Sequence, residues 1–486
     1  MAMLALAAVC LPAIAQGIRH SKKGESVTTQ DGELTITCID QRRGYGSGDT
    51  FDADIYSPKS ATFSPDGKKV YVNSLEGCKT VVYDVATRKK LKTILHDFES
   101  GEGPLWNKPS GYYNFTHYPD GEKRAFKGKP VEEAVTPDGR YMFVPYYRRS
   151  FDINAQDPSA LAVIDMQKDE IVRMIETGPL PKMVRVSHDG KLLAITHWGD
   201  NTVGLLDISD RNPANWKHLP PIVIGKQLNL NYSLTSSVNR DSGSGFLLRG
   251  TVFLPGDSLL LVSGMAGPLN VIDVKRREWI GTFPSLSNVR HLTLQNDMLY
   301  MSRNSAGEVM TVPVAEIVEA VNTQRGNSRS FSAKGVRSTK VGGGARTLKV
   351  SPSGKYIFVA CNTASLISIV RTEDMKEIGR ITADSFPVGL DVSPDGSMVV
   401  TTSQGRSGQG GGNAVNFFEV KYAEPEPQPV FEAPEDEIES DSAAMVREER
   451  EGAGGGSVSA VGWTFIGIGI AAVIAAILLV MKKRRR

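Results

Sequence analysis

The sequence contains few of the residues that usually build covalent or metal chemistry. It has only 4 cysteines in 486 residues, and no Cys-x-x-Cys-His pattern for attaching haem occurs. Its 7 histidines show no short spacing typical of metal ligands. The glycine runs at 342–344 and 410–412 are not phosphate-binding loops, because no predicted helix follows them. We therefore expect neither a cofactor nor a resident metal ion.

A strong charge of one sign is also missing from the chain as a whole. The 56 Lys and Arg residues face 54 Asp and Glu residues, which gives a net charge of +2. The last five residues carry +5 and residues 423–451 carry −9, so the remaining chain carries +6. A body this weakly basic does not predict binding to nucleic acid.

The N-terminus has the pattern of an export signal. An apolar run at 3–12 is followed by Ala13-Ile14-Ala15, which matches the small-x-small pattern of a cleavage site. We expect a signal peptide at 1–15, with a buried N-terminal strand or helix as the alternative. Cleavage would leave Cys38, Cys78 and Cys361, an odd number, so at least one thiol stays unpaired within the chain.

The C-terminus predicts a membrane anchor. Residues 460–481 carry no charge and would span about 33 Å as a helix, and the basic tail 482–486 follows directly. By the positive-inside rule the tail is cytoplasmic and the body lies outside. Residues 423–459 are Pro-rich, then acidic, then Gly-rich, which predicts an extended stalk. The last 33 residues also resemble cleaved sorting signals of the GlyGly-CTERM type, although we prefer a plain anchor.

One phrase recurs between these ends: an apolar strand, a Ser-Pro-Asp-Gly-like turn, a second strand, and a third strand ending near Asp. Proline presets the first corner of such a turn, and glycine adopts the positive φ that closes it. The turns lie at 64–67, 136–139, 187–190, 351–354 and 393–396, with weaker copies at 255–257 and 295–297.

Seven such units of four short antiparallel strands predict an all-β fold, a seven-bladed β-propeller, over residues 33–422. The span allows about 56 residues per unit, more than the roughly 40–45 of compact blades. We therefore expect insertions at 97–128, 210–248 and 315–344. The alternating strand 33–40 is expected to close the ring by pairing into the last blade.

Two phrases make a family resemblance specific. Val70-Tyr71-Val72-Asn73-Ser74 and Ala162-Val163-Ile164-Asp165 resemble the YVTN-type repeat of bacterial and archaeal envelope propellers. The resemblance covers most of 58–420. It implies a seven-bladed propeller and gives only a weak indication of function, because that group includes surface-layer and binding proteins.

Cations recur at one position of the repeat, just before or within the first strand of each unit. Loops at this position open onto one face of a propeller, around its axis. Five units place a cation there, namely Lys59, Lys182, Arg249, Arg290 and Arg346, while the second unit has Glu132 and Glu133. Converging cations attract an anion, so we predict an anion site. The alternative is that these are ordinary solvated loop charges.

The loops between second and third strands add further candidate ligand-binding residues: Tyr146, Tyr147, Arg148, His197, Trp198, Arg303 and Asn362. Aromatic rings beside Arg and Asn are typical of sugar or peptide sites. The first insertion is also aromatic, and we favour its packing as a cap over a blade edge. Asp49, Asp52 and Asp54 are close enough in sequence for calcium, but a solvated loop is favoured.

The function we expect is binding at the cell envelope. The ligand would be an anionic or carbohydrate envelope component or another envelope protein, with membrane attachment through 460–481 and no nucleic acid. One alternative is a metal-dependent propeller lactonase or lyase, in which His197, His291 and Glu133 converge on a divalent ion. Another is a structural cell-surface protein.

Overall fold

The computed structural model describes residues 20–98, 104–113, 126–150, 152–229, 239–405 and 412–425. The predicted signal peptide, the stalk beyond residue 425, the predicted transmembrane helix and the basic tail lie outside these residues. Within the described ranges, no helix has the length and apolarity needed to cross a membrane.

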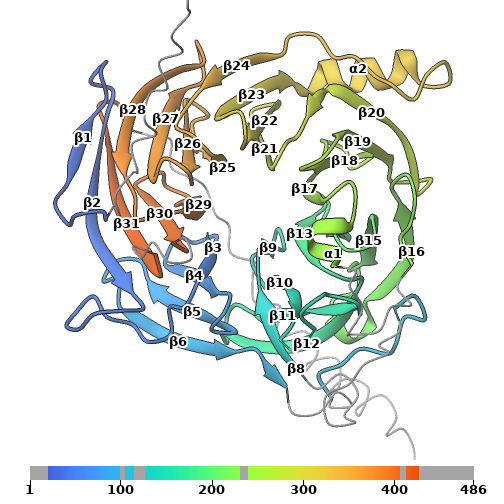
Figure 1. The fold of residues 1–486 in the computed structure, drawn as a ribbon, viewed down its shortest axis with the longest axis horizontal. Helices are drawn as coiled ribbons and strands as arrows, with labels where there is room; N and C mark the ends of the chain where they lie inside the picture. Colours follow the sequence, from blue (N-terminus) through green and yellow to red (C-terminus); the bar gives the residue numbers. More distant parts are fainter. Residues whose placement is uncertain are drawn as a thin grey trace, which may run out of the picture. The chain divides into compact units, whose positions relative to one another are not determined.

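The strands form seven antiparallel sheets, and these are the blades of a propeller (Figure 1). Blade 1 contains β3 (Pro58–Phe63), β4 (Lys69–Ser74), β5 (Lys79–Asp84) and β6 (Lys90–Leu95). Blade 2 contains β7 (Asp97–Phe98), β8 (Phe126–Pro130), β9 (Ala134–Val135), β10 (Tyr141–Arg149), β11 (Ser159–Asp165) and β12 (Glu170–Thr177). Blade 3 contains β13 (Pro181–Val186), β14 (Leu192–His197), β15 (Thr202–Asp207) and β16 (Lys217–Val223).

The other four blades continue in chain order around the ring. Blade 4 contains β17 (Leu248–Phe253), β18 (Leu259–Gly264), β19 (Pro268–Asp273) and β20 (Glu278–Ser287). Blade 5 contains β21 (His291–Gln295), β22 (Met298–Arg303), β23 (Glu308–Pro313) and β24 (Arg337–Lys340). Blade 6 contains β25 (Ala345–Val350), β26 (Tyr356–Cys361), β27 (Leu366–Arg371) and β28 (Lys376–Thr382). Blade 7 contains β29 (Pro387–Val392), β30 (Met398–Ser403), β31 (Ala414–Tyr422), β2 (Leu34–Arg43) and β1 (Ser26–Thr28).

The repeated turns have the predicted chemistry. In the first copy, Ser64 Oγ donates to Asp66 Oδ1 at 2.6 Å, and the same carboxylate oxygen accepts the Lys68 backbone N–H at 3.1 Å. Gly67 follows with a φ of 70°. The turn at 393–396 repeats this arrangement, with Ser393 Oγ at 2.5 Å from Asp395 Oδ1. Each tight turn aligns the two inner strands of its blade.

Strand β2 closes the ring, as the alternation in the sequence predicted. It pairs antiparallel with β31 from Leu34 opposite Tyr422 to Arg43 opposite Ala414. Leu34, Ile36 and Cys38 are buried against the core between blades 6 and 7. The first and last parts of the propeller sequence thus share one sheet, and β1 adds an outer fifth strand.

Two predicted insertions are shorter than expected, because each contains an outer strand of its blade. Strand β16 lies within 210–248 and β24 within 315–344. Strand β24 (RSTK) is wholly polar, and β16 (KHLPPIV) contains two prolines and is largely exposed or half-buried, so neither sequence has the apolar signal of an inner strand. The true additions include the short helix α1 (Arg240–Gly243) and the helix α2 (Val314–Gln324), whose buried residues join the core between blades 4 and 5.

The described part of the first insertion packs as the expected cap. The Met174 backbone N–H on the outer strand β12 donates to Leu105 O at 2.8 Å, and the Asn107 N–H donates to Met174 O at 3.1 Å.

The structure also shows the state of the three cysteines and of the acidic residues near the N-terminus of the propeller. Cys38, Cys78 and Cys361 are free thiols. Lys90 Nζ lies 2.7 Å from Asp52 and 2.8 Å from Asp54, and Lys79 Nζ lies 2.5 Å from Asp54, so two lysines pair with these two acids.

Candidate functional site

The inner strands carry β-bulges at the position of the predicted cations. The pairing register shifts around residues 59, 182, 249–250, 346–347 and 388 in strands β3, β13, β17, β25 and β29. A bulge leaves a residue outside the regular ladder and redirects its side chain. The bulges therefore free four side chains from the regular strand pairing at equivalent positions of their blades: Lys59, Lys182, Arg249 and Arg346.

The backbone entering these strands is also repeated. Two residues before the cation position, the chain adopts a positive φ of 51° to 82° in six of the blades. Side chains as different as Leu180 and Phe386 occupy this left-handed conformation, which is unfavourable for bulky residues. The same local geometry thus brings Arg290, which immediately precedes β21, to the position of the other cations. The six residues are Ser57, Leu180, Leu247, Asn288, Gly344 and Phe386.

Blade 2 presents acids instead of a cation because its inner strand is interrupted. Strands β8 and β9 pair with different halves of β10, and residues 131–133 lie between them. Ser60 Oγ holds the break by donating to Val131 O at 2.5 Å. Glu132 accepts a bond from Lys59 Nζ at 3.0 Å and lies 3.4 Å from Arg249 Nη2. Glu132 is therefore the shared counter-ion of two cations on blades 1 and 4.

We call Lys59, Lys182, Arg249, Arg290 and Arg346 the cation ring. Four of them expose between 5% and 8% of their surface, Arg290 being the exception. Burial lowers the pKa of Arg346, and the nearby charges of Arg290 and Arg249 lower it further. Burial followed by the charge of Arg249 lowers the pKa of Arg290 to about 9. The arginines of blades 4, 5 and 6 are therefore close enough to repel one another.

The pKa values of the two neighbouring glutamates are shifted in opposite directions. Burial works to raise the pKa of Glu132, but Lys59 and Arg249 outweigh it and hold that pKa below its ordinary value. Burial and the charge of Glu132 raise the pKa of Glu133 well above its ordinary value. Glu133 Oε1 lies 3.0 Å from Ser60 Oγ. Of these two glutamates, Glu132 therefore offsets charge in the ring.

Lys182 has its own counter-ion, which the sequence analysis missed. Asp241 of α1 lies 3.5 Å from Lys182 Nζ, and it also accepts bonds from the Tyr147 hydroxyl and from Arg148 at 2.9 Å. The Lys182 ammonium lies 3.6 Å from the centre of the Tyr147 ring and 4.5 Å from that of Trp198. Three of the predicted ligand-binding residues, Tyr147, Arg148 and Trp198, thus lie around Lys182. Together with Asp241 they enclose its ammonium group instead of leaving it open to a ligand.

The other predicted residues lie away from the ring. Tyr146 is buried between blades 1 and 2, where its hydroxyl lies 2.8 Å from His96 Nδ1. His197 is buried in blade 3 and uses both ring nitrogens, Nδ1 with Thr202 Oγ1 at 2.8 Å and Nε2 with the Gly178 N–H at 3.1 Å. Arg303 pairs with Glu308 of its own hairpin at 3.0 Å.

Asn362 reaches the ring only through another side chain. Its Oδ1 lies 3.3 Å from Asn304 Nδ2, and Asn304 Oδ1 accepts a bond from Arg290 Nη1 at 3.3 Å. Asn304 also donates to Ala345 O at 3.1 Å. These two asparagines therefore position Arg290 beside the start of β25.

A second polar layer lies three residues further along the inner strands. Lys349 Nζ is 3.0 Å from Asp391 Oδ1, and Arg185 Nε donates to Thr251 O at 3.4 Å. Burial, then the charge of Lys349, lowers the pKa of His291 to about 3. The repeat spacing could have revealed this layer, because Arg185, Lys349 and Asp391 each lie four residues before the turn position aligned on Asp.

The geometry bears on the metal-dependent alternative. A metal-dependent enzyme of this kind requires His197, His291 and Glu133 to bind one divalent ion. The ring nitrogens of His197 are instead hydrogen-bonded to Thr202 and Gly178. Among the residues that the structure describes, no group of three or more His, Cys, Asp and Glu side chains could hold a metal ion.

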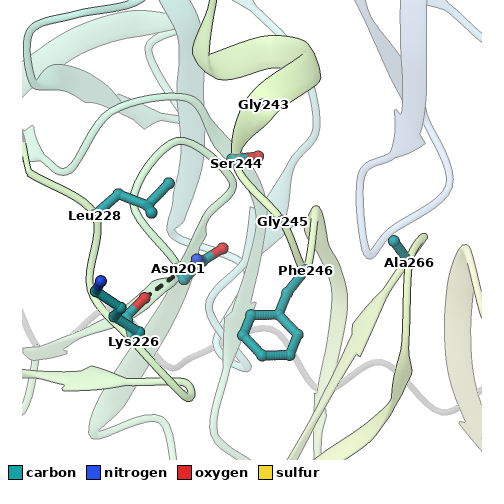
Figure 2. Close-up of a pocket in the computed structure, with 8 residues that line it drawn as sticks. All are labelled: Asn201, Lys226, Leu228, Gly243, Ser244, Gly245, Phe246 and Ala266. Atoms are coloured by element: carbon teal, nitrogen blue, oxygen red, sulfur yellow. Dashed lines mark hydrogen bonds between the residues drawn. The ribbon is translucent and has the colours of Figure 1, made fainter. Parts of the chain in front are cut away.

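A small pocket lies beside α1, between the loops of blades 3 and 4. It has a volume of about 290 Å³ and is lined by Asn201, Lys226, Leu228, Gly243, Ser244, Gly245, Phe246 and Ala266 (Figure 2). Asn201 Nδ2 donates to Lys226 O at 3.2 Å across one side. The segment 243–246 follows Asp241 directly, so this pocket adjoins the enclosure of Lys182.

Comparisons with known proteins support the fold alone. No family model and no curated protein matches the sequence. Among solved structures, the chain is similar to a chain of hydrazine synthase from Kuenenia stuttgartiensis, with 14% identity, a TM-score of 0.50, and coverage of 79% of this chain and 100% of that one. It is also similar to the β-propeller domain of Cps50 (Swd1) from Myceliophteria thermophila, with 13% identity, a TM-score of 0.49, and coverage of 75% and 97%.

Proposed function

We propose that this chain is an extracytoplasmic, membrane-anchored propeller that binds an anionic or sugar-bearing ligand of the cell envelope at the cation ring. The observation that supports the proposal is the surplus of buried positive charge. Five cations converge there, and the contacting acids are Glu132 and Asp241. A buried charge is costly unless it is paired, and a bound anion would supply the missing counter-charge.

The proposed location follows from the sequence at both ends of the chain. The signal-like segment 1–15 and the apolar segment 460–481 with its basic tail indicate a body outside the cytoplasm. The YVTN-like phrases lie in strands β4 and β11 of a seven-bladed propeller, which is consistent with the YVTN-type envelope proteins. A metal-dependent enzyme is the less favoured function, because the ring nitrogens of His197 contact Thr202 and Gly178 and not His291 or Glu133.

Ligand-dependent stability tests the proposal. Sulfate, phosphate or an acidic sugar should raise the melting temperature by mass action, and added sodium chloride should reduce the gain by screening. The double variant Arg346→Ala with Lys182→Ala removes cations from opposite parts of the ring, so the gain should disappear. Equal stabilisation by every salt, or a gain that survives the double change, would instead favour a structural protein with solvated charges.

A further inference from the structure

Some cations of the cation ring contact an acidic counter-ion among the described residues, and others do not. Lys182 is enclosed by Asp241, Tyr147 and Trp198. Within the described residues the Arg346 guanidinium has neither an ion pair nor a hydrogen bond, and its Nε is a buried donor without an acceptor. Arg290 bonds only to the neutral amide of Asn304 there, and its Nε also lacks an acceptor. The unmet demand for negative charge is therefore concentrated on blades 5 and 6.

One turn holds these two arginines side by side. The Arg290 backbone N–H donates to Ser302 O at 2.8 Å, and Ser302 Oγ donates to Arg346 O at 2.5 Å. Asn304 adds its bonds to the Arg290 side chain and to Ala345 O. Both strand entries are thus fixed to the end of β22. Asn304 also holds the guanidinium of Arg290, and the guanidinium of Arg346 lies 6.0 Å from the centre of the Phe386 ring. Two guanidinium groups on neighbouring strand entries offer several donors for the oxygens of one anionic group.

The charge balance indicates the class of that group. Among the described residues Lys59, Arg249, Arg290 and Arg346 share only Glu132. Burial holds the pKa of Lys59 well below its ordinary value, so the surplus is three positive charges when Lys59 is protonated and two when it is not. A carboxylate would leave one or two of these charges unbalanced. A phosphoryl group carries about −1.5 to −2 at pH 7 and has three strong acceptor oxygens, so it leaves at most about 1.5 positive charges unbalanced.

We propose that Arg290 and Arg346 bind the phosphoryl group of the ligand, as inorganic phosphate or a phosphate monoester, at the junction of blades 5 and 6. This inference rests on the proposed function, because it assigns a place and a chemical class to the same site. Arg249 lies next to the phosphoryl group and remains shared with Glu132. Lys182 contributes only through its longer-range charge.

Calorimetric titration of the full-length protein tests the assignment. The probes are inorganic phosphate, glucose 6-phosphate and glucuronate, and the variants are Arg290→Met, Arg346→Met, Lys182→Met and Arg303→Met. Loss of a charged hydrogen-bond donor should weaken phosphate binding roughly 10- to 100-fold in each of the first two variants. Lys182→Met should weaken it by about threefold or less. Arg303→Met removes a cation that pairs with Glu308 away from the ring, so it should match the parent.

Each outcome separates this inference from the proposed function. If Lys182→Met costs as much as Arg346→Met, or if glucuronate binds as tightly as glucose 6-phosphate, the assignment is wrong although the ring still binds anions. If the parent binds none of the three probes, the proposed function fails as well. If a phosphate compound binds and both Arg290→Met and Arg346→Met weaken its binding roughly 10- to 100-fold, the assignment holds. The tighter of the two then identifies the source as free phosphate or an ester.

Discussion

Glu132 is the residue on which the electrostatics of the ring depends most directly. Its carboxylate contacts Lys59 and Arg249 from two other blades, and it is held as an anion by those contacts. The adjacent Glu133 lies 3.0 Å from Ser60 Oγ, and burial together with the charge of Glu132 raises its pKa well above the ordinary value. The pKa values of two consecutive glutamates are thus shifted in opposite directions.

Replacing each glutamate by glutamine should separate these two states. Glu132→Gln leaves two buried cations without their counter-ion, so the free energy of unfolding should fall by about 3 kcal/mol. Glu133→Gln replaces a neutral acid with a neutral amide, so the change should stay below about 1 kcal/mol. Urea unfolding of both variants measures the difference. Equal losses would show that the charge assignment is wrong.

His96 should give the protein a measurable pH dependence. Its Nε2 lies 2.8 Å from Thr80 Oγ1 and its Nδ1 lies 2.8 Å from the Tyr146 hydroxyl, and burial lowers its pKa to about 3. A lowered pKa in the folded state means that this contribution to stability is present above about pH 6.5 and is lost as the pH falls.

The variant His96→Gln should therefore be destabilised less at acid pH than at neutral pH. Each pH unit between the unfolded and folded pKa values changes the contribution by about 1.4 kcal/mol. The deficit of the variant relative to the parent should shrink by about 2 to 3 kcal/mol between pH 6.5 and 4.5. Paired urea titrations at both pH values test this, and a constant deficit would contradict it.

At the scale of elements, the sequence predicted the repeated strands and turns, but it missed the elements that lack the repeated pattern. Apolar inner strands, the Asp-Gly turns and the closing strand all follow from local patterns, and they are confirmed. Strands β16 and β24 were not foreseen, because an edge strand needs no alternation of apolar residues. The cation ring was foreseen from its spacing, but Asp241 was not. It lies on a helix of four residues outside the repeat, and only the fold brings it to Lys182.

Strand β2 should be worth far more to stability than its neighbour β1. A chain beginning at Glu33 loses only the outer strand β1, whereas one beginning at Gly44 also loses β2 and exposes the edge of β31. We expect the first to melt within a few degrees of the parent and the second to melt many degrees lower or to aggregate. Thermal unfolding compares the two, and similar melting temperatures would contradict a closing role for β2.

At the scale of the whole molecule, charge is sorted along the chain. The acids cluster in residues 423–451, beyond the last strand, while the propeller and its flanks keep a surplus of cations. Within the propeller, the buried part of that surplus gathers where the inner strands bulge. The net charge of the whole chain hides this arrangement, because the charges of the separate regions nearly cancel.

The pairing of β2 with β31 also has a consequence for how the chain reaches its native state. The partners Leu34 and Tyr422 stand at opposite ends of the propeller sequence, so the contact is among the most non-local that the chain can make. During synthesis, β2 is made first and must wait with an open edge until the last strand emerges. Ring closure therefore cannot precede the synthesis of β31, and until then the open edge of β2 is available for mispairing with a neighbouring copy.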